Sequence, residues 1–147
     1  MQYTSEIEIL LPRQRVVELF DNPDNLSKWM PGLLSFEHVK GVPGQVGAQS
    51  RLTFQMGKRN MVMTETVTVR NLPDEFSGTY ETNGVVNEVR NKFIAIDEGR
   101  TKYISESIFN FSGIMKFIAP LMKGTFKKTS LDYLVRFKAF AEAEGVK

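Results

Sequence analysis

Glu65 is the residue whose type and spacing say most about possible chemistry. It follows Met61 and Met63 and precedes Val67 and Val69 at intervals of two, so in a β-strand its carboxyl group falls on the apolar side that these four residues form. A carboxylate there must be paired, protonated or in contact with water in a cavity. Such a group orients a ligand or acts as a general acid or base. The alternatives are a β-bulge that turns Glu65 outward and a structural partner such as an arginine or a tyrosine.

Two tyrosines and the single histidine are the other polar candidates. Tyr80 shares its side of a predicted strand with Phe76, and Tyr103 also occupies a position compatible with an inner face. A tyrosine gives a ligand pocket apolar area and one hydrogen-bonding end, although a core tyrosine bonded to backbone is an equal alternative. His38 shares parity with Phe36 but has no nucleophile motif or second ligand beside it. We interpret it as structural or exposed.

The apolar side of a binding site is predicted from the methionines and aromatic residues. One register on two adjacent strands holds Phe54, Met56, Met61 and Met63, and thioethers suit an irregular pocket or an irregular core equally well. Trp29, the only tryptophan, is either a cavity wall or a packing anchor, and the anchor is favoured. The predicted ligand-binding residues are Trp29, Phe54, Met61, Met63, Glu65, Tyr80, Tyr103, Met122 and Phe126.

The composition excludes several other chemistries. Without cysteine there is no disulfide, thiol nucleophile or thiolate metal site. The glycines of residues 41–47 form neither a dinucleotide-binding nor a Walker pattern. A formal net charge of +2 is too small to suggest a nucleic-acid partner. We therefore expect no cofactor, no metal and no nucleic acid.

The residues that could do chemistry must be positioned by a sheet. Residues 2–11 alternate as a half-buried strand, and Pro12 then opens a short helix that is followed by a second one near residues 25–30. Six strands are predicted between residues 33 and 111, because turn signals recur through that span. The register of residues 85–96 stays open, and with it the faces of Asn87 and Asn91.

A long helix is predicted over residues 125–142, to within two to four residues at each end, with a kink or break at Pro120 and Gly124. A sheet of seven strands has one apolar face and only this helix to cover it. The predicted fold is therefore an α+β helix-grip, in which a curved antiparallel sheet wraps around the C-terminal helix and leaves a cavity where the two diverge. At 147 residues the chain forms one domain, residues 1–147.

Five motifs in this order carry a resemblance to a known superfamily. They are Pro12 with the helix 15–20, Asn22-Pro-Asp-Asn-Leu-Ser-Lys-Trp29-Met-Pro-Gly32, Gly44-Gln-Val-Gly47, Gly99-Arg-Thr101 and Ala119-Pro-Leu-Met-Lys123. The chain resembles the START-like or Bet v 1-like superfamily, in the branch of polyketide cyclase/dehydrase and lipid transport proteins (SRPBCC), over essentially its whole length. The resemblance implies a helix-grip around a hydrophobic cavity. Members of this superfamily include lipid carriers, hormone and quinone binders and aromatic polyketide cyclases.

The predicted function is binding of a small hydrophobic or amphipathic ligand between the sheet and the last helix. The first alternative is a polyketide cyclase, aromatase or dehydratase using the same cavity, with Glu65, His38 or Tyr103 as proton carrier. The second is a regulatory protein-interaction domain, which a contiguous apolar patch outside the cavity would favour.

The charge is uneven along the chain. Residues 112–147 hold seven basic and three acidic side chains, and Lys116, Lys123, Lys127 and Lys128 lie on or near the polar side of the last helix. We interpret these lysines as an ordinary solvated face, with transient contact to an anionic membrane as the alternative. Stable membrane insertion is not expected, because no stretch approaches 18 apolar residues. The start has no signal-peptide pattern, so we predict a cytoplasmic protein, either a monomer or a homodimer.

Overall fold

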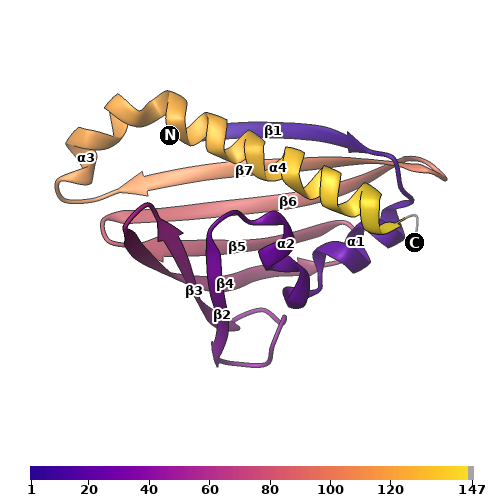
Figure 1. Ribbon diagram of the computed structural model, residues 1–147, viewed down its shortest axis with the longest axis horizontal. Coiled ribbons are helices and arrows are strands. Elements are labelled where there is room, and N and C mark those ends of the chain that lie inside the picture. The colour runs from indigo at the N-terminus through magenta and orange to yellow at the C-terminus, as the bar shows by residue number, and fades with distance from the viewer. Residues whose placement is uncertain (146–147) are drawn as a thin grey trace.

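The elements follow the predicted order in the computed structural model, which describes residues 1–145 (Figure 1). They are β1 (Gln2–Ile9), α1 (Arg13–Phe20), the 3₁₀ helix η1 (Pro23–Asn25), α2 (Leu26–Trp29), β2 (Leu33–Lys40), β3 (Gln49–Met56), β4 (Arg59–Asn71), β5 (Glu75–Thr82), β6 (Val85–Asp97), β7 (Arg100–Phe111), α3 (Met115–Ile118), the 3₁₀ helix η2 (Ala119–Met122) and α4 (Lys123–Gly145).

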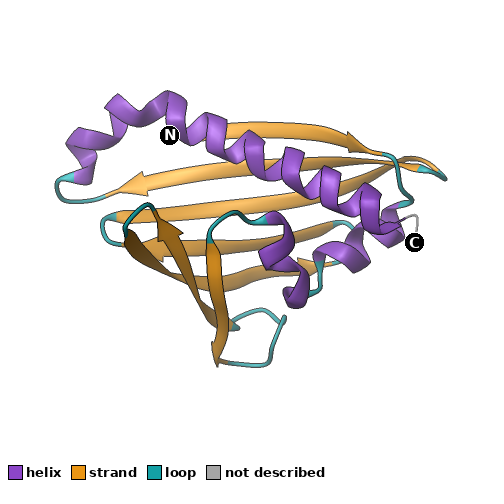
Figure 2. Cartoon of the chain, viewed as in Figure 1, coloured by secondary structure: helices purple, strands orange, loops and turns teal. Residues whose placement is uncertain are grey.

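All seven strands form one antiparallel sheet in the order β1-β7-β6-β5-β4-β3-β2. The strands from β2 to β7 follow one another as a meander, and β1 joins the far edge beside β7. Helix α4 crosses one face of this sheet, while α1 and α2 close one end (Figure 2). The predicted helix-grip fold is confirmed.

The C-terminal helix lies where it was predicted and begins after a break. Helix α4 spans Lys123–Gly145, which agrees with the predicted 125–142 within the few residues allowed at each end. Pro120 lies in η2 and not in an α-helix, because proline has no N–H to donate and its ring clashes with the preceding turn. Helix α4 packs on β1 and β7 and also contacts α1 and α2. None of the described helices is long and apolar enough to cross a membrane.

A β-bulge in β4 corrects one part of the predicted register. Val67 lies opposite Gly78, but a register shift follows, so Val69 lies opposite Ser77 and Arg70 opposite Phe76. Because a bulge adds one residue to one strand, it exchanges the two faces beyond that point. The expectation that Val69 continues the apolar side of β4 is therefore wrong.

After the bulge, Arg70 and not Val69 projects from the concave face. Its guanidinium donates two hydrogen bonds of 2.8 Å to the Asp21 carboxylate and a third of 3.2 Å to the Gly44 carbonyl. The same group lies 6.0 Å from the Phe76 ring centroid. Arg70 thus ties the β2–β3 loop and the end of α1 to the sheet.

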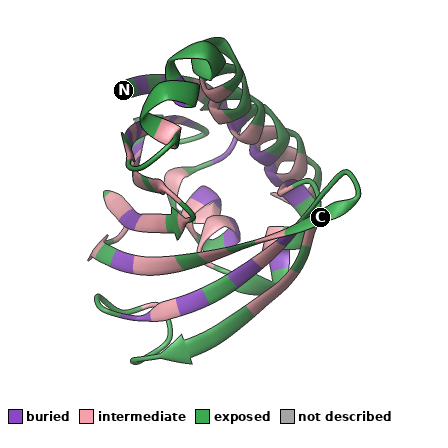
Figure 3. Ribbon diagram, turned by 90° about the vertical axis from the view of Figure 1, so that its left-hand side faces the viewer, coloured by how far each residue is buried: buried purple, intermediate pink, exposed green. Residues whose placement is uncertain are grey.

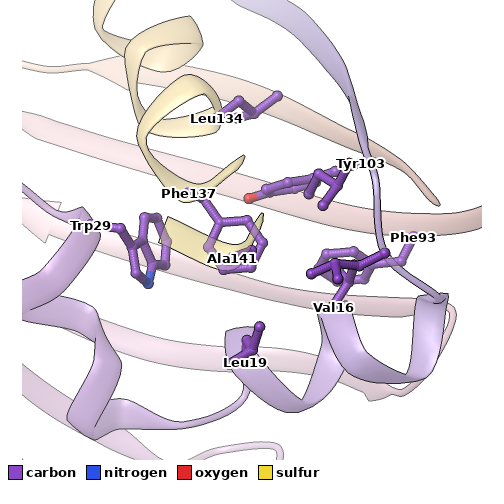
Figure 4. Close-up of a cluster of buried hydrophobic side chains, with 10 residues drawn as sticks. Val16, Leu19, Trp29, Phe93, Tyr103, Leu134, Phe137 and Ala141 are labelled. Atoms are coloured by element: carbon purple, nitrogen blue, oxygen red, sulfur yellow. The ribbon is translucent and has the colours of Figure 1, made fainter. Parts of the chain in front are cut away.

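The main hydrophobic core fills one end of the space between sheet and helix, where α1 and α2 also pack (Figure 4). The Phe20 ring packs in its middle, at 5.0 Å from Phe93 and 5.6 Å from Phe137. The buried residues of this core are Ile9, Leu11, Val16, Leu19, Trp29, Phe93, Tyr103, Leu134, Phe137 and Ala141.

Candidate ligand-binding site

A row of polar side chains crosses the concave face of the sheet. The register pairs His38 with Ser50, Ser50 with Glu65, Glu65 with Tyr80, and Tyr80 with Asn87. Residues directly opposite each other in antiparallel strands project from the same face. The polar row therefore runs over five strands, from β2 to β6, on the side that faces α4.

Glu65 and Tyr80 form the centre of this polar row. Burial raises the pKa of the Glu65 carboxyl group, and a hydrogen bond with Tyr80 lowers it by less. Burial, together with the charge of Glu65, raises the pKa of Tyr80 well above its usual range. Tyr80 therefore stays neutral, and its hydroxyl group donates a hydrogen bond to the Glu65 carboxylate. Both residues are half-buried, so the pair is not sealed in the core.

Asn87 extends the pair toward β6 with an unsatisfied acceptor. Its Oδ1 is buried and has no hydrogen-bond partner among the described residues. Buried polar atoms in proteins are nearly always hydrogen-bonded, and leaving one unpaired costs about 1–3 kcal/mol. A donor group on a bound molecule would satisfy this atom. The sequence did not single out Asn87, because β6 is mixed in polarity on both sides; only its register against Tyr80 and Phe109 places it here.

The next pair along the sheet is already satisfied within the protein. The Tyr103 hydroxyl donates a hydrogen bond of 2.7 Å to the Asn91 Oδ1, and both residues are buried. Burial raises the pKa of Tyr103 far above its usual range. The Tyr103 ring packs at 5.0 Å from Phe93 inside the main core. Tyr103 therefore lies in the core, beyond the polar row.

Trp29 also lies in the main core. Its side chain is buried, with ring centroids 6.0 Å from Phe20 and 5.0 Å from Phe137. Its Nε1 is buried and has no partner among the described residues. The packing-anchor interpretation fits this position, and the free N–H is one further donor at the edge of the core.

The apolar residues beside the polar row come from β3 and β4. Met61 lies opposite Phe54, and Met63 lies opposite Leu52, all on the concave face. Phe54 and Leu52 are buried, whereas the two methionines are half-buried although they point to the same side. Methionines in this state provide adaptable apolar surface next to Glu65.

The two predicted site residues of the C-terminal helical region are less buried than Phe54 on the sheet. Phe126 of α4 is half-buried and packs on Phe109 at 4.9 Å and on Phe111 at 5.6 Å. Met122 of η2 is 38% exposed. Of the predicted residues, the structure thus brings together Phe54, Met61, Met63, Glu65 and Tyr80, and places Phe126 and Met122 on the helical side.

The edge of the concave face next to Met61 is open to solvent. Strand β4 begins at Arg59, but among the described residues its pairing with β5 begins only at Thr64 opposite Glu81. Because β5 ends at Thr82, the first residues of β4 extend past the β5–β6 turn and pair with β3. A solvent-open hollow of about 930 Å³ lies there, lined by Met61, Thr82 and Gly84 among others. From Met61, every second residue of β4 leads inward to Met63 and then to Glu65.

His38 stands at the outer end of the polar row, on the edge strand β2. It is exposed, as predicted, and its Nε2 lies 2.6 Å from the Gly41 carbonyl oxygen. Within residues 1–145, no three acidic, histidine or cysteine side chains come close enough together to hold a metal ion. The site is therefore described by neutral hydrogen-bonding groups, one carboxyl group and apolar walls.

A curved antiparallel sheet around a C-terminal helix, with a mixed polar and apolar concave face, defines a helix-grip protein. Residues 1–142 match the family described as polyketide cyclase / dehydrase and lipid transport. The chain belongs to this family. No curated protein matches the sequence significantly.

Several solved structures share the fold at low sequence identity. The protein TTHA0849 from Thermus thermophilus superposes with a TM-score of 0.79 at 14% identity, covering 98% of this chain and 99% of its own. The ZhuI aromatase/cyclase from Streptomyces sp. R1128 gives 0.79 at 13% identity, with 97% and 93% covered. Ara h 8.0201 gives 0.77 at 14% identity, with 97% and 98% covered. These likenesses establish the fold alone.

Proposed function

We propose that the protein binds a small hydrophobic or amphipathic molecule between the concave face of the sheet and α4. The apolar part of the ligand contacts Phe54, Met61 and Met63. Its polar end reaches the Glu65–Tyr80 pair and Asn87. A ligand with at least one hydrogen-bond donor suits this arrangement best, because no donor within residues 1–145 reaches the Asn87 Oδ1.

The observation that carries the proposal is the combination of Glu65, Tyr80 and Asn87 on one face. A carboxyl group on an apolar face is costly unless something compensates for its burial. Here the hydrogen bond with Tyr80 compensates in part for the burial of Glu65. On the next strand, the Asn87 Oδ1 is a buried amide oxygen without a partner among the described residues. Ligand pockets combine apolar walls with a few such placed polar groups. Membership of a family described by cyclases, dehydrases and lipid transport supports the same class of ligand.

Native mass spectrometry of protein purified from its own host tests this proposal directly. We expect a retained small molecule whose mass is lost on denaturation. Titration with an apolar fluorescent probe is the second measurement, and Asn87→Leu is expected to weaken binding of a hydroxyl-bearing probe more than that of a purely apolar one. Absence of both a retained molecule and probe binding would contradict the proposal.

The second candidate function is a cyclase, aromatase or dehydratase in the same space. It is favoured by the raised pKa of the Glu65 carboxyl group, because a carboxylic acid that keeps its proton to higher pH is a better proton donor near neutrality. Tyr80, which stays neutral, would hold this acid in place. The likeness to an aromatase/cyclase is compatible with such chemistry.

Glu65→Gln separates the two candidates because it keeps the shape and removes the ionisable proton. A binding protein should keep most of its affinity. An enzyme that uses this carboxyl group as acid or base should lose about 10²–10⁴-fold in rate while still binding. We expect retained affinity.

A further inference from the structure

The helical segment before α4 turns large apolar side chains toward solvent. Ile114 is 72% exposed, Phe117 79% and Leu121 87%. These are the three highest exposed fractions among the large hydrophobic residues of the described chain. We call these three residues the apolar knob. In Figure 3, which faces the end of the molecule where α3 lies, this helical segment is coloured as exposed.

The spacing of the knob places it on one side of the segment. Ile114, Phe117 and Leu121 are separated by three and four residues, which aligns them along one helical face. The opposite face holds Ala119, which is fully buried, and Met115, which lies against Gly84. An ordinary surface helix buries its apolar face and shows polar side chains to water, so the exposed face here has the reverse character.

The segment is fixed to the rest of the protein. The Ser112 amide donates to the Gly84 carbonyl at 2.9 Å, and the Tyr3 hydroxyl donates to the Lys123 carbonyl at 3.1 Å. Just beyond it, Phe126 packs on Phe109. The knob is thus held away from the core by an anchored backbone.

The stretch of chain that carries the knob has charged side chains of one sign only. Residues 113–128 contain Lys116, Lys123, Lys127 and Lys128 and no aspartate or glutamate. All four lysines are exposed. The same stretch therefore offers apolar side chains and four cationic groups, which is the composition of segments that lie in the interface of an anionic bilayer.

We propose that α3, η2 and the first two turns of α4 dock onto an anionic lipid surface. Ile114, Phe117 and Leu121 insert at the boundary between headgroups and acyl chains, and the lysine ammonium groups lie among the lipid phosphates. A lipid surface fits better than a protein partner because the apolar surface is a convex projection beside cationic groups. A protein would need a matching acidic recess.

Docking in this orientation places the hollow beside the lipid. Gly84 of the β5–β6 turn lines the hollow and also lies against Met115 of α3. An apolar molecule would then move between bilayer and concave face without crossing water. This last consequence rests on the proposed function, whereas docking itself requires nothing from the concave face.

Vesicle sedimentation with the full chain tests the docking. Vesicles of phosphatidylcholine mixed with phosphatidylserine should bind the protein, and vesicles of phosphatidylcholine alone should bind it much less. Added salt should weaken binding, because exposed charges are screened beyond about 8–10 Å. The double variant Phe117→Ser with Leu121→Ser should lower the affinity at least about tenfold. Lys116→Gln with Lys123→Gln should lower it by about tenfold or more at low salt.

Matched controls carry the same changes on other surfaces. Val42→Ser alters an apolar side chain that is 68% exposed in the β2–β3 loop, and Lys40→Gln removes an exposed charge from β2. Both should bind vesicles like the unchanged protein, and so should Glu65→Gln, whatever its effect on ligand. No binding to either vesicle, or an equal loss in the controls, would overturn the proposal. A different outcome would show that a second copy of the chain covers the knob. In that case the protein would bind no vesicles but would self-associate, and Phe117→Ser with Leu121→Ser would abolish the self-association.

Discussion

The two ends of the concave face are built from the same sheet and differ in what covers them. At one end, Phe93 and Tyr103 are 1% and 3% exposed beneath α1, α2 and the C-terminal part of α4. At the other end, Met61 and Met63 point to the same side of the sheet and remain half-buried. Inward direction alone therefore does not make a core residue; a helix must also lie above it. The filled end supplies stability, and we assign binding to the end with less cover.

The largest difference between the two ends should appear on truncation of a side chain. Phe137→Ala removes a fully buried ring from the filled end and should lower the free energy of unfolding by about 3–5 kcal/mol. Met63→Ala removes a side chain that water already reaches, and it should cost about 1 kcal/mol or less. Urea denaturation of both variants measures this contrast. Equal losses would mean that both ends are packed alike.

The two tyrosines allow a comparison at the level of one hydroxyl group. Tyr103→Phe leaves the buried Asn91 Oδ1 without the donor it now has at 2.7 Å, so it should cost about 1–3 kcal/mol of stability. Tyr80→Phe should cost less, because water reaches the half-buried Glu65. Its main effect should be weaker binding of hydroxyl-bearing probes. A larger stability loss from Tyr80→Phe would place the polar row in the core.

The smallest expected effect is a pH dependence that comes from Glu65. Burial raises its pKa in the folded protein, so the folded state binds this proton more tightly than the unfolded chain does. The resulting stability is complete below the pKa of an ordinary glutamate and is lost as the pH rises through the folded pKa. The stability of the wild type relative to Glu65→Gln should therefore decline over that interval. A difference that stays constant over that interval would contradict the burial of the Glu65 carboxyl group.

The fold was predictable because it is encoded in short-range patterns. Alternation from Met61 to Val67, turn signals such as Asn83-Gly84, and the helical spacing after Ser112 each report on a few neighbouring residues. The bulge after Val67 was not predictable, because it inserts one residue without a compositional signal. The ends of α4, by contrast, were predicted to within a few residues, because the helical spacing of apolar residues continues through Phe140.

The candidate site was only partly predictable for the same physical reason. Glu65 stands out because it interrupts an apolar face within one strand. Asn87 becomes meaningful only through its pairing with Tyr80 and Phe109, and Tyr103 is distinguished from Tyr80 only by the cover of α1 and α4. The exposure of the apolar knob could not be predicted, because helical spacing does not reveal which face of a short helix packs against the rest of the protein. Long-range contacts decide each of these cases.

Met63→Trp tests most directly whether the less covered end is free space. If Met63 borders a binding space, the indole should occupy that space, abolish binding of an apolar fluorescent probe and leave the denaturant midpoint nearly unchanged. Val86→Trp, on the convex face of β6, is the matched control and should keep probe binding. In a packed core the Met63 change is overpacking, which costs about 1–3 kcal/mol. Such a loss of stability, together with a wild type that binds no probe, would contradict the binding function proposed for this end of the molecule.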